Sequence, residues 1–580
     1  MQNKSLLCLL ISCFLLYFIG LGSFPSIDPA EAYYVEAARE MVELNDWIVP
    51  YLNYQVYFSK PIITFWLIAA SYKLFGISEL ASRLPFAMLS TAMVFAIYHC
   101  IGKLFTKRAG LFSALCLATA PLFLLVSRIS PVDIAFGFCL ELAILATAMT
   151  LESKGKIWSY VIWAALALGL LTKGPATLIL YGASVVLFLA WRRPSLYQSE
   201  EWLKQLNVIP GILLFLAIAI PWHWAVHQAS DGLFLKVFFL YENFARFSGH
   251  TNMGKMSWWF YIPVILAGFL PWVVCTPFCF VDYFRKKEVP MQLFLSFIAT
   301  TFVIFSLSGT KLITYILPVI PMLSIIVGVF LDRYLDKPQD YGKDVTIILI
   351  ALGFASIACF TGVYYSLAKV AVPELWKWMV VISSSIAGAI FALTLWKFLK
   401  RSIDREKFIK TYFLAQVLYL AVLCPVSFYI FGNKMQLDLK EIAIKATTMT
   451  DRISLLGEFM PSAIFYAQKP VNCFFNLDQI KPIANSPDAS PDAQTQLLIV
   501  KDKDLARLAQ IPGLKLETVM DSGKWHLYKT PGYMVTCVPT LEDVFKDPVV
   551  FNDLITKGSP VGPLTVPASA GRAYIPKKIK

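Results

Sequence analysis

"PSIDPAEAYYVEAAREMVELNDW" occupies residues 25–47 and closely follows an apolar stretch, residues 5–22, that is long enough to cross a bilayer. The segment carries a dense cluster of carboxylates, although 57% of the whole chain is hydrophobic and only 15% is charged. Charges are costly inside a membrane, so this cluster must lie at its surface or be paired. We therefore interpret the segment as part of a loop, residues 23–82, that covers a cavity at one membrane surface.

The composition of the whole chain indicates a multi-spanning membrane protein. Its mean hydropathy of +0.63 excludes an ordinary soluble protein, and its 15% of aromatic residues suits rings at bilayer interfaces. The formal net charge of +13 is expected from cytoplasmic loops that face anionic lipid, rather than from nucleic-acid binding. Most cysteines lie in apolar runs, and only Cys473 and Cys537 could pair, if their polar region faces an oxidising compartment.

The apolar segments predict about thirteen transmembrane helices. These segments are residues 5–22, 83–105, 110–127, 131–151, 156–172, 174–191, 208–227, 257–281, 291–308, 312–330, 345–367, 378–399 and 409–431. No clear cleavage pattern follows the first segment, so we expect a retained anchor. The stretch 61–76 is shorter and borders the charged loop, so we expect it to be interfacial or re-entrant.

Basic residues alternate between the connecting loops as a cytoplasmic N-terminus requires. Every second loop carries them, as Lys103, Lys107, Arg108, Lys154, Lys156, Arg192, Arg193, Arg285, Lys286, Lys287, Arg333, Lys337, Lys343, Lys400, Arg401, Arg405 and Lys407. The odd number of spans then places everything after about residue 432 in the periplasm.

We expect three parts: a transmembrane domain over residues 1–432, a small periplasmic α/β domain over 433–530, and a loosely ordered tail over 531–580. The α/β prediction for the second part rests on β-like runs such as "AIFYA" and "LLIV", which alternate with helix-like "KDKDLARLAQ".

Charges outside the cytoplasmic loops gather on the outer side of the predicted membrane domain. They include Lys60, Lys73, Arg83, Arg128, Asp133, Lys173, Glu242, Arg246 and Lys311. Several lie at the ends of spans or within them, where a charge costs about 2.5–3.5 kcal/mol and is usually functional and paired. A position among lipid headgroups is the alternative, which fits Lys73 well and Asp133 poorly. Nucleotide sugars are not available at this face, so an enzyme there needs a membrane-carried substrate such as a polyprenyl phosphate.

In such a site, lysine and arginine bind phosphate, while a carboxylate activates an acceptor hydroxyl or phosphate. Lys60 in "YFSKP" is one expected phosphate contact, with snorkelling to headgroups as the alternative. Lys311 and Tyr315 are four residues apart, so on a helix they would share a face and could grip a phosphate. Glu242 and Arg246 have the same spacing, which equally fits a surface ion pair.

Motifs between residues 26 and 320 resemble those of the bacterial lipid-linked glycosyltransferases of the GT-C type. This family includes protein O-mannosyltransferases and the 4-amino-4-deoxy-L-arabinose transferases that modify lipid A. The matching motifs are "EAYYVEAAREM", "NDWIVPYLN", "YFSKP", the Asp of "SPVDIAF", "LLTKGP", "ENFARF" followed by "SWWFYIPVILAGFLPW", and "KLITYILPVIPML".

The resemblance implies an integral glycosyltransferase of the bacterial inner membrane. It would move a sugar from an undecaprenyl-phosphate-like donor to a periplasmic acceptor, lipid A or another glycolipid first and a protein next. On this interpretation the donor phosphate is bound by Lys60, Arg83, Arg246, Lys311 and Tyr315.

The sequence departs from the family at the favoured catalytic acid. The family usually has Asp-Glu before the helix that "EAYYVEAAREM" matches; Glu31 aligns with that Glu, but Ala30 occupies the Asp position. Asp28 lies two positions earlier, and Asp28-Pro29 equally fits a helix start with Asp28 as its N-cap. The candidate catalytic acids are therefore Asp28, Glu31 and Asp133.

A divalent metal, possible in the family, is in doubt here. Ser59 and Asn243 stand where the lipid A enzymes commonly carry Glu and His. His223 and His227 end a predicted span beside tryptophans, which favours interfacial packing over metal binding. No cofactor is certain.

Two further classes of function compete with a glycosyltransferase. A lipid-linked substrate transporter would show inverted repeats and charges reachable from both sides, and we find neither. A lipid-binding relative without catalysis would keep the phosphate-binding residues but show no turnover.

Overall fold

The computed structural model describes residues 2–193, 196–239, 256–337, 339, 374–450, 452–474, 480–482, 495–511, 514–531 and 533–535. They fall into two compact units. The described parts of residues 1–21, 83–223 and 255–428 form the first unit, and those of residues 22–82, 224–254 and 429–580 form the second. The predicted span 345–367, most of the predicted tail, and Cys537 lie outside the described residues.

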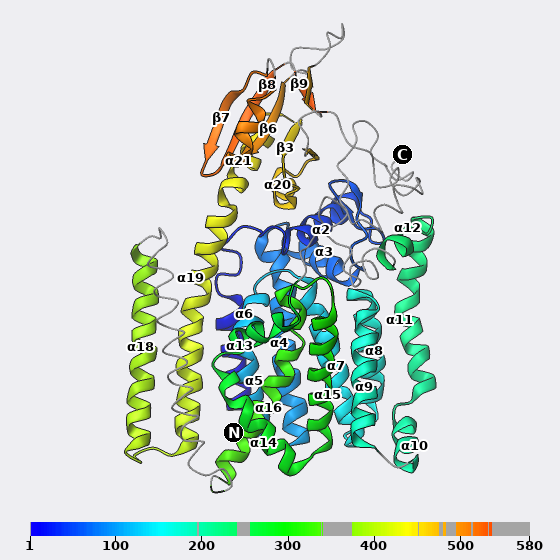
Figure 1. Ribbon diagram of the computed structural model, residues 1–580, viewed down its shortest axis with the longest axis vertical. Coiled ribbons are helices and arrows are strands. Elements are labelled where there is room, and N and C mark those ends of the chain that lie inside the picture. The colour runs from blue at the N-terminus through cyan, green and yellow to red at the C-terminus, as the bar shows by residue number, and fades with distance from the viewer. Residues whose placement is uncertain are drawn as a thin grey trace. The chain divides into compact units, whose positions relative to one another are not determined.

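The first unit consists of helices (Figure 1). They are α1 (Gln2–Cys13), η1 (Phe14–Phe18), most of α4 (Glu79–Leu104), α5 (Lys107–Ala118), α6 (Pro121–Val126), α7 (Val132–Leu151), α8 (Ile157–Lys173), α9 (Ala176–Arg192), α10 (Leu196–Gln205), most of α11 (Val208–Ala229), η3 (Trp258–Phe260), α13 (Tyr261–Gly268), η4 (Trp272–Cys275), α14 (Thr276–Lys286), α15 (Val289–Leu307), η5 (Ile313–Ile316), α16 (Val319–Asp336), α18 (Glu374–Leu399) and the first part of α19 (Arg405–Thr447).

Among the described residues, 6 helices are long and apolar enough to cross a membrane, so the chain is a mostly helical membrane protein, as the sequence predicts. They lie in α4, α7, α11, α15, α18 and α19. The predicted span over 257–281 contains two helical segments that are bent by 106° at a break. Pro271 is the last residue of the break, and a proline has no N–H with which to continue a helical ladder.

Close packing of α5 against α16 depends on one glycine. A Cβ added at Gly328 of α16 would lie 2.2 Å from the backbone nitrogen of Ser113 in α5. The two backbones can therefore approach only because this residue has no side chain, as is common where membrane helices cross.

The second unit combines the loop after the first apolar helix with the C-terminal region. Its elements are α2 (Ala32–Leu44), β1 (Tyr51–Leu52), β2 (Gln55–Val56), α3 (Ile63–Phe75), α12 (Leu233–Leu235), the end of α19, β3 (Ile453–Leu456), α20 (Pro461–Ala467), β4 (Val471–Phe474), β5 (Ile480–Pro482), β6 (Thr495–Lys501), α21 (Asp502–Leu508), β7 (Glu517–Ser522), β8 (Trp525–Pro531) and β9 (Tyr533–Val535). With 13 residues, α3 is shorter than the about 20 that cross a bilayer.

The main sheet of this unit has the strand order β4-β3-β6-β8-β7. β3 pairs in parallel with β4 and β6, while β8 pairs antiparallel with β6 and β7. The run "LLIV" lies in β6 as expected, but "AIFYA" lies in α20 rather than in a strand. Pro461 at the start of α20 fixes a backbone angle that suits the first helical turn, which overrides the β preference of Ile464 and Phe465.

The core of the sheet forms where α19 and α20 pack against its strands. Leu439, Ile442 and Ala446 of α19 are fully buried. They pack in one cluster with buried side chains of β3, β6 and β8 that include Leu455, Ile499 and Leu527. The part of α19 after residue 428 is therefore part of the core of the second unit.

Candidate functional site

The predicted site residues are distributed over both units. Asp133, Arg83, Lys311 and Tyr315 lie in the first unit, and Asp28, Glu31, Ser59 and Lys60 lie in the second. Glu242, Asn243 and Arg246 lie outside the described residues.

A buried ion pair joins α7 to α8 in the first unit. Asp133 lies in the first turn of α7, where a carboxylate is favoured by the helix dipole, and its Oδ1 is 2.5 Å from Nζ of Lys173. Lys173 is the last residue of α8, which ends because Gly174 adopts a φ of 74°. The two side chains are only 9% and 10% exposed, so water screens their attraction weakly.

Two aromatic rings complete the surroundings of this lysine. Its Nζ lies 4.6 Å from the ring centroid of Phe136 in α7 and 4.4 Å from that of Tyr315 in η5. These distances are within the range of cation–π attraction. The arrangement brings a carboxylate, an ammonium group and a phenol together where α7, α8 and η5 meet, and it unites the predicted residues Asp133 and Tyr315.

Lys311 and Tyr315 do not share a helical face, contrary to our expectation. Leu312 is extended, and the helical turn η5 begins only at Ile313. The Lys311 side chain is buried, and its Nζ donates to the carbonyls of Ser308 at 2.5 Å and Met256 at 3.4 Å. The ammonium group of Lys311 therefore contacts backbone oxygens of two segments: Met256 lies just before the aromatic turn η3, and Ser308 lies just after α15.

Two buried arginines of the first unit bind the end of the first apolar helix. Nη1 of Arg83 donates to the carbonyl of Leu21 at 3.0 Å. Arg128 donates to the carbonyls of Leu16 at 2.7 Å and Ile19 at 2.5 Å. The last carbonyls of a helix have no intrahelical donor, so these contacts have a structural role. Arg83 therefore has a structural contact in addition to its predicted contact with the donor phosphate.

In the second unit, Asp28 contacts the first turn of α20. Its Oδ1 accepts the backbone N–H of Ser462 at 3.2 Å, and its Oδ2 accepts the hydroxyl of the same serine. Burial raises the pKa of Asp28 to about 7, while the donors Ser462 and Gln436 lower it and the nearby carboxylate of Glu31 raises it. Asp28 does not cap α2, because that helix starts at Ala32 with Glu31 in the N-cap position.

Glu31 is fully buried, and its Oε1 accepts the backbone N–H of Ile27 at 3.1 Å. This bond closes the loop that carries Asp28. The two candidate acids of the second unit are thus neighbours, and both are buried.

The remaining acids of the opening stretch have structural partners. Arg39 donates to Glu36 at 2.7 and 2.8 Å and also binds Glu43. Glu40 accepts the backbone N–H of Tyr54 at 2.7 Å, and burial followed by the charge of Glu36 raises the pKa of Glu40 well above its ordinary value. These contacts attach the β1–β2 hairpin to α2, so most of the carboxylate cluster holds the loop together.

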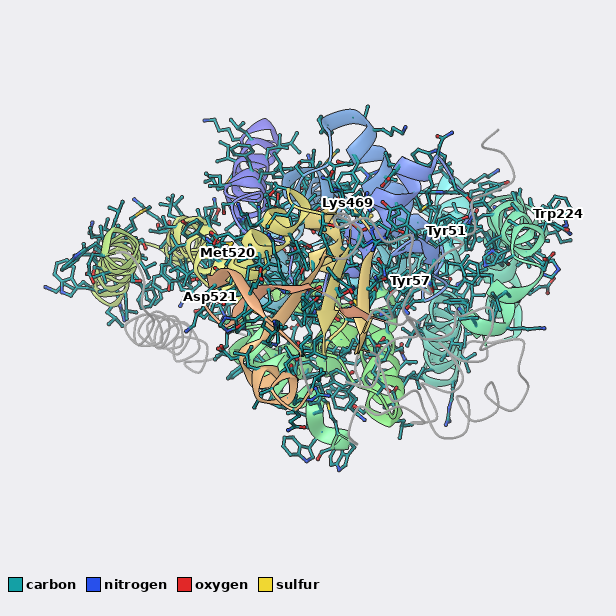
Figure 2. The ribbon with its side chains drawn as sticks, turned by 90° about the horizontal axis from the view of Figure 1, so that it is seen from above. Tyr51, Tyr57, Trp224, Lys469, Met520 and Asp521 are labelled. Atoms are coloured by element: carbon teal, nitrogen blue, oxygen red, sulfur yellow. The ribbon has the colours of Figure 1, made fainter. Side chains whose placement is uncertain are left out.

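The hairpin in turn contacts the main sheet. The side-chain amide of Asn53 donates to the carbonyl of Val471 at 2.9 Å and accepts its N–H at 3.0 Å, which covers part of the edge strand β4. Figure 2 shows Tyr51 and Tyr57 of this loop on the side of the sheet away from Met520 and Asp521 of β7. β7 is the opposite edge strand, in agreement with the strand order.

Lys60 is half-buried, and its Nζ donates to the carbonyl of Ser59 at 2.7 Å and lies 3.4 Å from the hydroxyl of Ser59. A serine hydroxyl is a poor substitute for a carboxylate metal ligand. Within the described ranges, no group of three or more His, Cys, Asp and Glu side chains could hold a metal ion. Of the two ligand positions in doubt, only Ser59 is described, and it does not fit the family's metal, so we derive no step through one.

Sequence reasoning named Lys173 among the outer-face charges without assigning it to the site, and it missed Ser462. Lys173 could have been weighted more strongly, because a lysine that ends an apolar helix is costly unless it is paired. Ser462 gave no signal, because it meets Asp28 across 434 positions of sequence.

Comparison with known proteins shows which proteins this chain is similar to. A model of the dolichyl-phosphate-mannose-protein mannosyltransferases matches residues 59–224. An undecaprenyl phosphate-alpha-4-amino-4-deoxy-L-arabinose arabinosyl transferase of Proteus mirabilis is 31% identical over 399 residues, which cover 66% of this chain and 70% of that protein. A transferase of the same name from Pseudomonas fluorescens is 28% identical over 347 residues, which cover 57% of each chain, so little more than half of that relative is matched.

The fold agrees with a solved structure of the same kind. The crystal structure of ArnT from Cupriavidus metallidurans bound to undecaprenyl phosphate matches 91% of this chain and 98% of its own, with a TM-score of 0.75 at 21% identity. Together with the apolar helices, these similarities indicate a bacterial inner-membrane protein with the fold of lipid-linked GT-C glycosyltransferases. The chain belongs to the family of the undecaprenyl phosphate-4-amino-4-deoxy-L-arabinose arabinosyl transferases.

Proposed function

We propose that this protein transfers 4-amino-4-deoxy-L-arabinose from an undecaprenyl-phosphate donor to lipid A at the periplasmic face of the inner membrane. The observation that carries the proposal is the 31% identity with the Proteus mirabilis transferase over 70% of that protein. The buried charged groups of both units are consistent with it, because a membrane-carried phosphate and an acceptor need cations and a carboxylate.

The donor phosphate is bound, in this proposal, by Lys60, Arg83, Arg246, Lys311 and Tyr315. Lys311 is the best supported of them, because its described contacts are two backbone carbonyls. Neutral carbonyls leave the charge of the ammonium group uncompensated, and a phosphate oxygen forms a stronger, charge-assisted hydrogen bond. Lys173 extends the set, because its ammonium group lies over the ring of Tyr315.

Asp28, Glu31 and Asp133 are the candidate acids that activate the acceptor. Asp28 is favoured among them because its pKa of about 7 suits proton exchange near neutral pH. Asp133 is the second candidate, since Lys173 compensates its charge and keeps an acidic group in a buried position.

Purified protein in lipid vesicles tests the proposal directly. Wild-type protein supplied with undecaprenyl-phosphate aminoarabinose and lipid A is expected to yield lipid A heavier by one aminopentose. Asp28→Asn is expected to slow the transfer by at least about 100-fold, the usual contribution of a general base. Donor binding without transfer by the wild-type protein would instead indicate a relative without catalysis, and export of intact donor would indicate a transporter.

Transfer to a protein is the second candidate function. It is favoured by the match of residues 59–224 to the protein mannosyltransferase model. Mass spectrometry of periplasmic proteins from cells with and without this protein separates the two candidates, because only a protein acceptor would gain a sugar there.

The finer topology belongs to the same proposal. We infer about thirteen spans, a cytoplasmic N-terminus, a transmembrane domain over 1–432, a periplasmic domain over 433–530 and a tail over 531–580. Single cysteines introduced into the predicted loops should react with an impermeant thiol reagent from the periplasm only at loops on that side.

A further inference from the structure

We propose that Ser462 is a positioning residue for Asp28: its hydroxyl and its backbone N–H hold the carboxylate that accepts a proton in the transfer reaction. The inference rests on the proposed function, since it concerns the acid that we assign to the acceptor. It gives α20 of the C-terminal region a part in catalysis.

The geometry engages both oxygens of the carboxylate. Ser462 is the second residue of α20, and it donates its N–H to Oδ1 of Asp28 at 3.2 Å and its hydroxyl to Oδ2. The same loop is attached to the same helix at a second point, where the hydroxyl of Tyr466 accepts the N–H of Ser26 at 2.7 Å. The direction of the Asp28 carboxylate is therefore set by α20.

The chemistry of the donors distinguishes this carboxylate from a structural one. Buried carboxylates in structural roles are usually paired with Lys or Arg, whereas the described donors to Asp28 are neutral groups of Ser462 and Gln436. Neutral donors orient a carboxylate and still allow it to take up a proton. Each of its oxygens can accept a further hydrogen bond, such as one from a substrate proton.

In the part of the chain that the structure describes, two titratable groups have electrostatic interactions with Asp28. Glu31 lies on the same loop and raises the pKa of Asp28, and the thiol of Cys473 on β4 is a further neighbour. Burial raises the pKa of that thiol to about 12, so it stays neutral near pH 7. Ser462 and Gln436 are neutral donors, so removal of either changes the proton affinity of Asp28 without adding or removing a charge; Ser462 is the one that contacts both carboxylate oxygens.

The test is the pH dependence of sugar transfer by the full chain in lipid vesicles. Ser462→Ala removes the hydroxyl donor, which stabilises the charged carboxylate, so the pKa of Asp28 rises. The acidic limb of the pH–rate profile should then move to higher pH by about one unit, the shift expected from the loss of one hydrogen bond to a charged group. Ser462→Thr restores a hydroxyl, and the limb should return toward the wild-type position.

Tyr466→Phe is the matched control. It removes hydrogen bonds to Ser26 and Glu79 from the same helix but leaves the contacts of Asp28 in place. This variant should lose thermal stability to a similar extent, while the acidic limb of its pH–rate profile stays where it is in the wild type. If the acidic limb shifted in both Ser462→Ala and Tyr466→Phe, a general loosening of α20 would explain the shift. That result would overturn the positioning role of Ser462.

Ser462→Cys covers the case in which the alanine variant does not fold. Its thiol is a weak donor of similar size, so the limb should move in the same direction by less. Active variants that all keep the wild-type limb would overturn the inference and leave the proposed function intact. Wild-type protein without sugar transfer would reject the proposed function itself.

Discussion

Substitutions of Asp133 and Lys173 can show whether this buried ion pair serves the stability of the fold or the transfer of the sugar. Lys173→Met leaves a buried carboxylate without its partner, which should lower the free energy of unfolding by about 3–5 kcal/mol. The double variant Asp133→Leu with Lys173→Met should recover most of that stability, because buried ion pairs can be replaced by apolar groups of similar volume. We expect the double variant to fold but to transfer no sugar. Thermal unfolding in detergent measures the first result, and a transfer assay measures the second. Transfer by the double variant at the wild-type rate would show that this pair is not part of the site.

A histidine of the C-terminal sheet should make stability depend on pH. His526 on β8 bonds to Asp521 of β7 through Nδ1 at 2.7 Å and to Asp502 through Nε2 at 2.6 Å. Burial alone would lower its pKa, but the two carboxylates raise the pKa above 6.5. The raised pKa means that the stabilisation is fully present below about pH 6.5 and is lost as the pH rises through the higher value in the folded protein. Thermal unfolding of the full chain between pH 5.5 and pH 8.5 should show this decline, and His526→Gln should flatten it.

At the scale of elements, the crossing of α5 and α16 offers a sharp comparison of two glycines. Gly328→Ala places a Cβ 2.2 Å from the backbone nitrogen of Ser113, and overpacking of this kind should cost about 1–3 kcal/mol. Gly388 of α18 has open space around an added Cβ, so Gly388→Ala should be neutral or slightly stabilising, because alanine favours a helix more than glycine does. The midpoint of thermal unfolding in detergent measures both. Equal effects of the two substitutions would mean that α5 and α16 are not so closely packed.

The elements also show what sequence patterns can predict. Helices α4, α7 and α15 lie close to three of the predicted spans, because an apolar run of about 20 residues has few alternatives to a helix in a membrane. The sequence did not predict the break at Pro271, and the prediction of a strand at "AIFYA" was wrong. Both depend on a single proline, whose local effect outweighs the average preference of the residues around it.

At the scale of the whole molecule, the sequence predicted a membrane glycosyltransferase but not the contacts of its acids. Glu31 was chosen because it aligns with the family's Glu, and Asp28 because it is the nearest Asp to the family's Asp position; the structure shows both buried in the second unit. The contacts of Asp28 with Ser462 and of Asn53 with Val471 join segments more than 400 positions apart. Local patterns carry no information about such pairs, which depend on how the loop and the C-terminal region fold together.

The central claim concerns the reaction, and mass spectrometry of lipid A tests it most directly. Lipid A would be compared from cells that lack this protein, cells that carry the wild type and cells that carry Asp28→Asn at the same level in the membrane. We predict that lipid A gains one aminopentose only with the wild type. Lipid A of the same mass in all three strains would contradict the proposed transfer. A full gain of mass with Asp28→Asn would keep the reaction but show that Asp28 is not the acid that drives it.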